Sequence, residues 1–240
     1  MSRWPDLRER SEALELMDDR AIAGPELLDA LRQLRWINWL LGAAWPTFEG
    51  VVTLWQQAGR PHRVTLLDVG AGSGDVNRLL LRWAAWWGID LRITLVDVHP
   101  DTCATAAAQF QHEPRVQVVC ADLFNLPFNH VDIVSASLVL HHIPTAELPL
   151  VVGTLLEAAR IGVVINDLQR HVVAWAAIWL ATRLFSRNRM LRHDAPLSVR
   201  RGFRRADFAH LPVAPHVTRL QCRWRPLFRY LIVAAKVPAR

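Results

Sequence analysis

A glycine-rich turn between a strand and a helix constrains this chain most. Residues 64–69 are almost all β-branched or aliphatic, which is typical of a strand buried on both faces. Gly70, Gly72 and Gly74 follow, and they allow a tight turn and the close approach of a ligand to the backbone. A helix that begins at Asp75 would direct its free N–H groups and positive dipole end at that ligand. The stretch predicts a unit that holds a nucleotide-like ligand.

Strands and helices alternate after this turn, which favours βαβ units and a parallel sheet. The chain closes with two strand-like segments around Pro226, which predict an antiparallel hairpin at the sheet edge. We therefore expect an α/β fold: a doubly wound, mostly parallel, seven-stranded Rossmann-like sheet with an antiparallel edge strand. The expected strands are 64–69, 91–96, 116–120, 131–135, 161–165, 217–223 and 229–235, and the intervening helices are 75–87, 102–111 and 146–160.

The remaining segments predict a cap and a lid. Residues 1–60 read as an N-terminal helical cap, with helical spacing at 12–17, 25–42 and 48–57. The second of these is apolar almost all round, so we expect Trp36 and Trp39 to be buried. Residues 61–240 form the core. Within it, 168–203 is expected as a substrate lid, made of one long helix to about Arg189 and then a polar loop.

Composition narrows the class of protein. The chain is 52% hydrophobic, which excludes a disordered protein. No uncharged apolar run reaches the ~20 residues that span a bilayer, and the first residues are polar rather than a secretory leader. The three cysteines, Cys103, Cys120 and Cys222, lack metal-ligand spacing. We expect a reduced, cytoplasmic protein with no metal.

The net charge of +6 is unevenly distributed. Residues 183–240 hold 14 basic and two acidic side chains, whereas residues 1–182 carry a net charge of −6. The basic segment is expected to face an anionic partner such as a phospholipid surface, a carrier protein or a phosphorylated substrate. A solvated basic face without a partner is the alternative. A membrane partner would place the protein at the inner face of the membrane.

Acidic residues end the second and third strands, at the edge where open α/β sheets bind ligands. Asp97 could accept hydrogen bonds from ribose hydroxyls, and Asp122 could accept one from an adenine amino group. Each has a structural alternative, since aspartate also caps helices and turns. The two acids together favour a nucleoside-containing cofactor.

These motifs resemble those of the class I S-adenosylmethionine-dependent methyltransferases. Residues 67–74 look like that family's first motif, Asp97 matches its ribose acid, and Asp122 matches its adenine contact. The alternative is a nicotinamide-binding domain, whose fingerprint has glycine or alanine at the position where this chain has Asp75. The resemblance implies S-adenosylmethionine as cofactor, bound by Asp68, Gly70, Ala71, Gly72, Gly74, Asp97, Val98, Asp122, Leu123 and Ser137.

Two histidines after the fourth strand are candidate catalytic residues. His141 and His142 lie near the expected position of the donor methyl, and histidine is suited to removing a proton from an acceptor near neutral pH. In the alternative, at least one of them only caps a helix or bonds locally. His171 and His193 are weaker candidates.

The acceptor is expected to be a hydroxyl or acidic carbon of an apolar small molecule. Residues 166–171 and 192–203 resemble a bacterial subgroup of methyltransferases that act on phenolic, quinone or polyketide-like molecules. The motif of nucleobase amino-methyltransferases is absent after strand four, so we expect no nucleic acid. A degenerate fold that only binds a membrane or carrier, and a methyltransferase for RNA or protein, remain alternatives. The candidate substrate-binding residues are Asn166, Asp167, Arg170, His171, Trp175 and His193.

Overall fold

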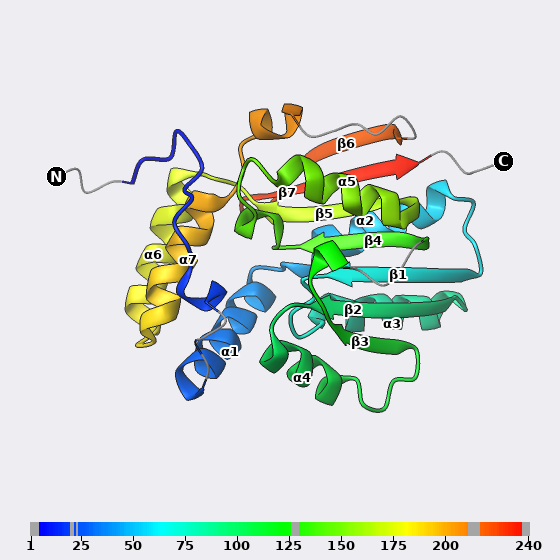
Figure 1. Cartoon of the computed structure of the whole chain (residues 1–240), viewed down its shortest axis with the longest axis horizontal. Coiled ribbons are helices and arrows are strands. Elements are labelled where there is room, and N and C mark those ends of the chain that lie inside the picture. Colours follow the sequence, from blue (N-terminus) through cyan, green and yellow to red (C-terminus); the bar gives the residue numbers. More distant parts are fainter. Residues whose placement is uncertain (1–4, 20–21, 23, 126–129, 211–216, 237–240) are drawn as a thin grey trace.

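The computed structural model describes residues 5–19, 22, 24–125, 130–210 and 217–236, and its centre is a seven-stranded sheet (Figure 1). The strand order is β3-β2-β1-β4-β5-β7-β6. The first five strands are parallel, and β7 runs antiparallel to both β5 and β6. The predicted fold class is therefore confirmed, and the closing hairpin lies at the sheet edge. The strands are β1 (Arg63–Val69), β2 (Asp90–Asp97), β3 (Val116–Cys120), β4 (Val131–Ser137), β5 (Ala159–Leu168), β6 (Val217–Arg225) and β7 (Arg229–Lys236).

Helices cover both faces of the sheet, and each face has its own apolar core. One core joins α2, α3 and α4 to the sheet through side chains such as Leu54, Leu80 and Phe110. The other joins α5 to the opposite face through side chains such as Leu155 and Leu156. The helices are α1 (Pro25–Leu40), α2 (Ala44–Gln57), α3 (Asp75–Trp87), α4 (Pro100–Gln109), α5 (Leu148–Ala158), α6 (Val172–Phe185) and α7 (Arg189–Arg201), with short 3-10 helices η1 (Leu16–Asp18), η2 (Leu123–Asn125), η3 (Leu140–His142) and η4 (Arg205–His210).

Three helices lie beyond the carboxyl ends of the parallel strands. Helices α6 and α7 form an antiparallel pair between β5 and η4, and α1 packs beside α7 (Figure 1). The division into a cap, a core and a lid stays a prediction. In the structure α2, from the expected cap, packs directly on β5 and β7. No helix in the described residues has the length and apolar character to cross a membrane.

The lid differs from the prediction, because α7 is a helix where a polar loop was expected. Pro196 lies inside it, and a proline there removes the hydrogen bond to the carbonyl four residues earlier. That carbonyl belongs to Arg192, and it accepts a bond from the Arg183 guanidinium instead, at 3.1 Å. Asn188 caps the first turn through a side-chain bond from the Leu191 N–H. Tertiary bonds thus support a helix that the local pattern obscures.

Two expectations for the N-terminal region are wrong. Residues 12–17 are not a helix: only η1 is helical there, because the N–H groups of Leu16 and Met17 bond to Asp194 across the structure. Trp36 and Trp39 are exposed rather than buried. Helix α1 rests mainly on Leu27 and Ala30, which pack against Met190 of α7.

Candidate functional site

The glycine turn after β1 has two packed glycines and one open glycine. Gly70, Gly72 and Gly74 all have φ between +56° and +75°, which glycine adopts without strain. A Cβ on Gly70 would lie 2.3 Å from Val139 Cγ2, and one on Gly74 would lie 2.7 Å from a ring carbon of Phe110. A Cβ on Gly72 would meet no atom within 4 Å. The backbone at Gly72 is thus the part of the turn that a ligand can approach.

Asp68 lies beneath the turn and ties three elements together. Its carboxylate accepts hydrogen bonds from Ser135 Oγ on β4 and Asn77 Nδ2 on α3, both at 2.6 Å. The side chain is buried, and the burial raises the pKa of Asp68 to about 6. The structure therefore places this predicted cofactor residue under the site, where it holds the turn in position.

Asp97 lies at the edge of the turn, where the predicted ribose contact should be. Its Oδ2 accepts a bond from the Gly72 N–H and its Oδ1 one from the His99 N–H, both at 3.0 Å. A carboxylate oxygen has two lone-pair sites, so each oxygen can still accept a ribose hydroxyl. Val98 follows with its side chain partly exposed. The Ala71 N–H donates to the Val96 carbonyl and fixes the turn against β2.

Asp122 and Leu123 follow β3 on the same edge. The Ala121 N–H donates to the Asp97 carbonyl at 3.0 Å, which brings the two acidic strand ends together. Asp122 accepts a hydrogen bond from the Phe124 N–H at 3.2 Å, so it also stabilises the local turn. Both residues are half-buried. The positions fit the predicted contact with a nucleobase.

A buried amide lies at the other end of the site, where β4 and β5 end. Asn166 Nδ2 donates to the Ala43 carbonyl, to Thr47 Oγ1 and to Ser137 Oγ, at 2.8, 3.0 and 3.1 Å. The Ala43 carbonyl can only accept, so it fixes the orientation of the amide. Asn166 Oδ1 is buried and has no hydrogen-bond partner among the described residues. This unpaired acceptor beside Ser137 suits a bound donor such as the amino group of a methionine moiety.

His141 and Asp167 form a buried dyad near the turn. The ring Nδ1 of His141 lies 2.7 Å from Asp167 Oδ1, and the His141 N–H donates to Oδ2 at 3.2 Å. The Asp167 carboxylate is a hydrogen-bond acceptor, so in the neutral ring Nδ1 carries the proton and Nε2 has the free lone pair. Burial pushes the pKa of Asp167 up, but the charge and hydrogen bond of His141 outweigh it and hold that pKa below its usual value.

The chain turns sharply to bring His141 there. Leu138 has φ +58°, which a residue with a side chain rarely adopts, and its N–H donates to the Asn166 carbonyl at 2.8 Å. Val139, which packs against Gly70, follows in the same turn. The dyad is thus positioned two residues from a contact with the glycine turn.

His142 lies beside His141 but faces a different acid. The two imidazole rings are 4.1 Å apart, and His142 Nδ1 lies 2.7 Å from Asp18 Oδ1. Asp18 also pairs with Arg201 of α7 at 3.1 Å. Burial lowers the pKa of His142, but the Asp18 carboxylate and the nearby Glu15 raise it overall above its usual value. The acids around His142 therefore favour its protonated form.

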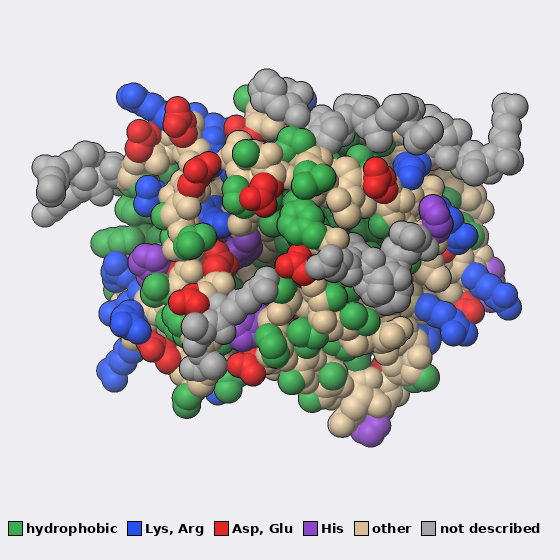
Figure 2. Space-filling model, in the orientation of Figure 1, with side chains coloured by type: hydrophobic (Ala, Val, Ile, Leu, Met, Phe, Trp, Pro, Cys, Tyr) green, Lys and Arg blue, Asp and Glu red, His purple; other side chains and the backbone are tan. Residues whose placement is uncertain are grey.

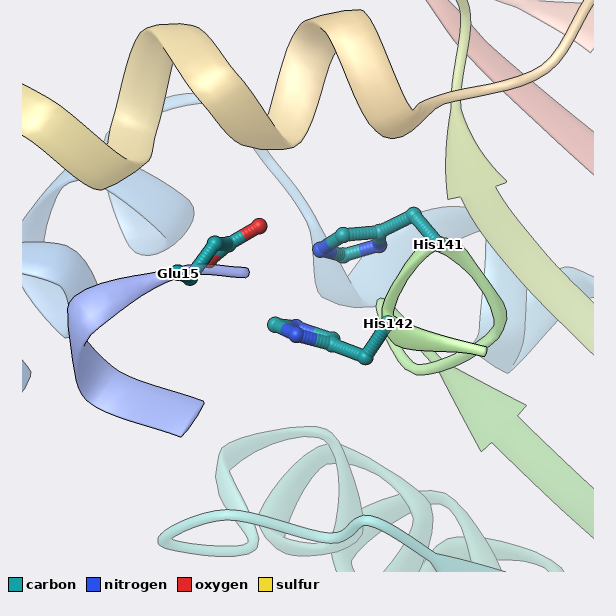
Figure 3. A group of neighbouring side chains, drawn as sticks. All are labelled: Glu15, His141 and His142. Carbon is teal, nitrogen blue, oxygen red and sulfur yellow. The ribbon is translucent and has the colours of Figure 1, made fainter. Parts of the chain in front are cut away.

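Glu15 joins the histidine pair from the N-terminal segment (Figure 3). Each of the three side chains offers a ligand atom, and these atoms all lie within 4.8 Å of one another. Two imidazoles and a carboxylate could hold a divalent transition metal. Ser198 donates to Glu15 at 2.9 Å and Asp167 bonds to His141, whereas His142 Nδ1 lies near Asp18 without forming a hydrogen bond of good geometry.

The N-terminal segment is held over this group by arginines. Arg10 donates to the carbonyls of Leu140, His141 and Ile143. Arg201 donates to the carbonyls of His141 and His142 at 2.9 and 2.6 Å. Arg10, Glu15, Asp18 and Arg201 were not predicted as site residues, because only the folded chain brings them to the histidines. Thr47, which reaches Asn166 and Ser137, was not predicted for the same reason.

The contacts recorded for the other predicted substrate residues are with groups outside the dyad. Arg170 is buried, and its guanidinium donates to the carbonyls of Leu7 and Gly202. His171 caps α6, and Trp175 stacks on Trp179. His193 is half exposed and bonds to Asp194.

Comparisons with known proteins show which domain family and fold the chain is similar to. The family model described as "Methyltransferase domain" matches residues 66–162, which run from the first strand through the glycine turn and the histidine pair into β5. No curated protein matches the sequence.

Solved structures show the same fold at low sequence identity. The chain is similar to the plantazolicin methyltransferase BamL in complex with a triazolic desmethylPZN analog and SAH, with a TM-score of 0.66, 12% identity, and 88% of this chain and 91% of that chain covered. It is also similar to magnesium protoporphyrin IX methyltransferase (ChlM) from Synechocystis PCC 6803 with bound SAH, with a TM-score of 0.55, 15% identity, and coverage of 82% and 85%. The citrinin polyketide synthase CMeT domain gives a TM-score of 0.54 at 13% identity, with coverage of 72% and 46%.

Proposed function

We propose that this chain, which carries an S-adenosylmethionine-dependent methyltransferase domain, methylates a hydroxyl or acidic carbon of an apolar small molecule, with His141 as the base. The domain, the type of activity and the cofactor follow from the matched family model, the shared fold and the glycine turn. The acceptor and the roles of single residues are the proposal. The observation that carries it is the His141–Asp167 dyad beside that turn.

The residues around the turn suit the cofactor. Gly72 presents open backbone, Asp97 keeps acceptor sites for the ribose, and Asn166 Oδ1 supplies a buried acceptor for the amino group. When bound, S-adenosylmethionine supplies an electrophilic methyl group. Because that group is already activated, the protein's tasks are to position the acceptor and remove its proton.

His141 is suited to remove the proton. Asp167 stays ionised, so it fixes the tautomer in which Nε2 is the proton acceptor, and it stabilises the imidazolium that forms. The His141 ring is buried, which keeps bulk water from the reacting atoms. The dyad thus supports proton removal from an acceptor with a pKa above neutrality, such as a phenol.

His142 is proposed to donate a hydrogen bond to the acceptor rather than to remove its proton. Although burial lowers the pKa of His142, Asp18 and Glu15 raise it overall, which favours the protonated ring, in which both nitrogens donate hydrogen bonds. A donor next to the base suits an acceptor with a second oxygen, as in quinones and polyketide-like phenols. We propose that the reaction needs no metal, because the methyl group of S-adenosylmethionine is already activated and the proposed base is a side chain.

An apolar acceptor fits the surroundings and the neighbours. The lid helix α6 is rich in tryptophan, leucine and valine, and Asp167 of β5 lies only five residues before its first residue. The structural neighbours include enzymes named for plantazolicin and for magnesium protoporphyrin IX. We propose a cytoplasmic protein whose acceptor is a small molecule of comparable apolar character.

Calorimetry with S-adenosylmethionine tests the cofactor, and methyl transfer to a panel of apolar phenols tests the acceptor class. We expect the H141A variant to bind the cofactor normally and to lose turnover by about 10²–10⁴-fold. The H171A variant serves as a matched control, because it removes a histidine that caps α6 away from the dyad. Full turnover in H141A would remove the base from the proposal, and absent cofactor binding in the wild type would overturn the whole proposal, leaving a degenerate binding module.

A further inference from the structure

Helix α6 exposes apolar side chains where a helix of a soluble domain exposes polar ones. Val173, Ala177, Leu180 and Leu184 follow one another at helical spacing, and all four are exposed. The exposed fractions are 53% for Val173, 50% for Leu180 and 66% for Leu184, and Phe185 at the end of the helix reaches 87%. Contiguous apolar surface of this kind marks an interaction site.

Arginines surround the same end of the helix. A pocket of about 340 Å³ is lined by Arg183, Arg187, Arg189, Arg192 and His193, at the turn between α6 and α7. Figure 2 shows Lys and Arg side chains along this edge of the molecule, interspersed with Asp and Glu side chains. The exposed apolar side chains and the pocket share one helical hairpin.

The positive charge of this pocket is hardly neutralised. Arg183 and Arg192 donate to backbone carbonyls, which carry no net charge. Among the described residues, the only ion pair recorded for the four arginines joins Arg189 to the exposed Glu26 at 3.5 Å. Several guanidinium groups are therefore available to an anion, and arginine binds phosphate groups with paired hydrogen bonds.

We propose that the α6–α7 hairpin, with its exposed apolar residues and its four arginines, docks on an anionic phospholipid membrane. Such a surface offers both features together: acyl chains for the Val173–Leu184 stripe and Phe185, and phosphates for the arginines. Trp179 lies on the same helix, and the Arg183 guanidinium stacks over its ring, 5.4 Å from the ring centroid. Tryptophan with arginine is typical of the boundary between headgroups and acyl chains.

Docking there would bring the membrane toward the part of the site that holds His141 and His142, where the acceptor is proposed to bind. Helix α7 is the second half of the hairpin, and its Arg201 holds the carbonyls of both histidines. Arg201 lies nine residues from Arg192 of the pocket, about 13 Å along α7, so an apolar acceptor dissolved in the bilayer would be delivered toward the histidines rather than directly to them. This link to delivery rests on the proposed function, whereas the docking itself does not.

Sedimentation of the full chain with vesicles tests the docking. We expect binding to phosphatidylglycerol–phosphatidylcholine vesicles at about 0.15 M salt and little binding to phosphatidylcholine alone. An R187Q/R189Q variant should bind about 25-fold more weakly, since each arginine near such a surface contributes about fivefold. An L180Q/L184Q variant should lose at least tenfold, because the apolar contacts are removed.

Matched control variants remove the same types of side chain from another part of the surface. An R63Q/R92Q variant removes two equally exposed arginines of β1 and β2 and should bind like the wild type, as should an L150Q/W86Q variant on α5 and α3. Equal loss in the controls, or equal binding to neutral vesicles, would overturn the proposal. Cofactor binding by calorimetry is measured on every variant, so a failure of the proposed function is seen separately from a failure of docking.

Discussion

The two kinds of glycine in the turn should respond differently to the same substitution. A Gly70→Ala change introduces a side chain at φ +63°, which costs about 1–2 kcal/mol in a left-handed conformation. Its Cβ would also lie 2.3 Å from Val139 Cγ2, and overpacking of this kind costs about 1–3 kcal/mol more. The variant should lose about 2–5 kcal/mol of its free energy of unfolding.

A Gly72→Ala change at φ +56° carries only the first cost, about 1–2 kcal/mol, because its Cβ meets no atom. The same Cβ projects into the space that a ligand would use. The Gly72→Ala variant should therefore stay folded and bind S-adenosylmethionine at least about tenfold more weakly, a loss of about 1.4 kcal/mol.

Urea unfolding and calorimetry on both variants separate the two effects. A Gly70→Ala, Val139→Ala double variant provides the control, because shortening Val139 removes the Cγ atoms that the new Cβ would strike. The double variant should be more stable than the sum of the single changes predicts. The reasoning is refuted if Gly70→Ala destabilises no more than Gly72→Ala, or if the Val139 change is simply additive.

Three further predictions concern the charged groups of the site. Asp167→Asn should lower turnover by about 10²–10⁴-fold with unchanged cofactor affinity, because the amide no longer fixes the His141 tautomer; turnover within threefold of the wild type would contradict this. Asp68 has a folded pKa of about 6, above its unfolded value, so the native state favours its protonated form. The free energy of unfolding should therefore fall by about 3 kcal/mol as pH rises from about 4 to 6, and urea titrations at several pH values should show a flatter slope for Asp68→Asn. Chelators should leave turnover unchanged, and Zn²⁺ should inhibit by binding the lone pair of His141; inhibition should be weaker in a Glu15→Gln variant, which has lost a metal ligand. Inactivation by chelators would show instead that a metal is required.

Much of the core was predictable because its signals are local. The run of aliphatic residues before Gly70 defines β1, and the predicted helix 75–87 coincides with α3. Strand five was predicted as 161–165 but runs from Ala159 to Leu168, because β7 pairs along its polar end as far as Leu168. Pairing with a distant strand thus extends an element beyond its apolar sequence.

The acceptor side was less predictable because its partners are far apart in the chain. The sequence places His141 and His142 after β4, but it cannot show that Asp167 and Asp18 bond to them. The exposed tryptophans of α1 were misjudged for a similar reason, since an all-round apolar helix is normally buried. Exposure on the surface depends on which neighbours the fold supplies.

The bond between Glu15 and Ser198 has a consequence for how the protein is made. The two residues are separated by 183 positions, so the N-terminal segment cannot find its place until α7 has left the ribosome. Contacts of such long sequence separation form late and slowly. The half of the site around the histidines should therefore be completed after β1 to β5 and the glycine turn, which precede α7 in the chain, and a nascent chain that stops before α7 would have its turn in place with the histidines still uncovered.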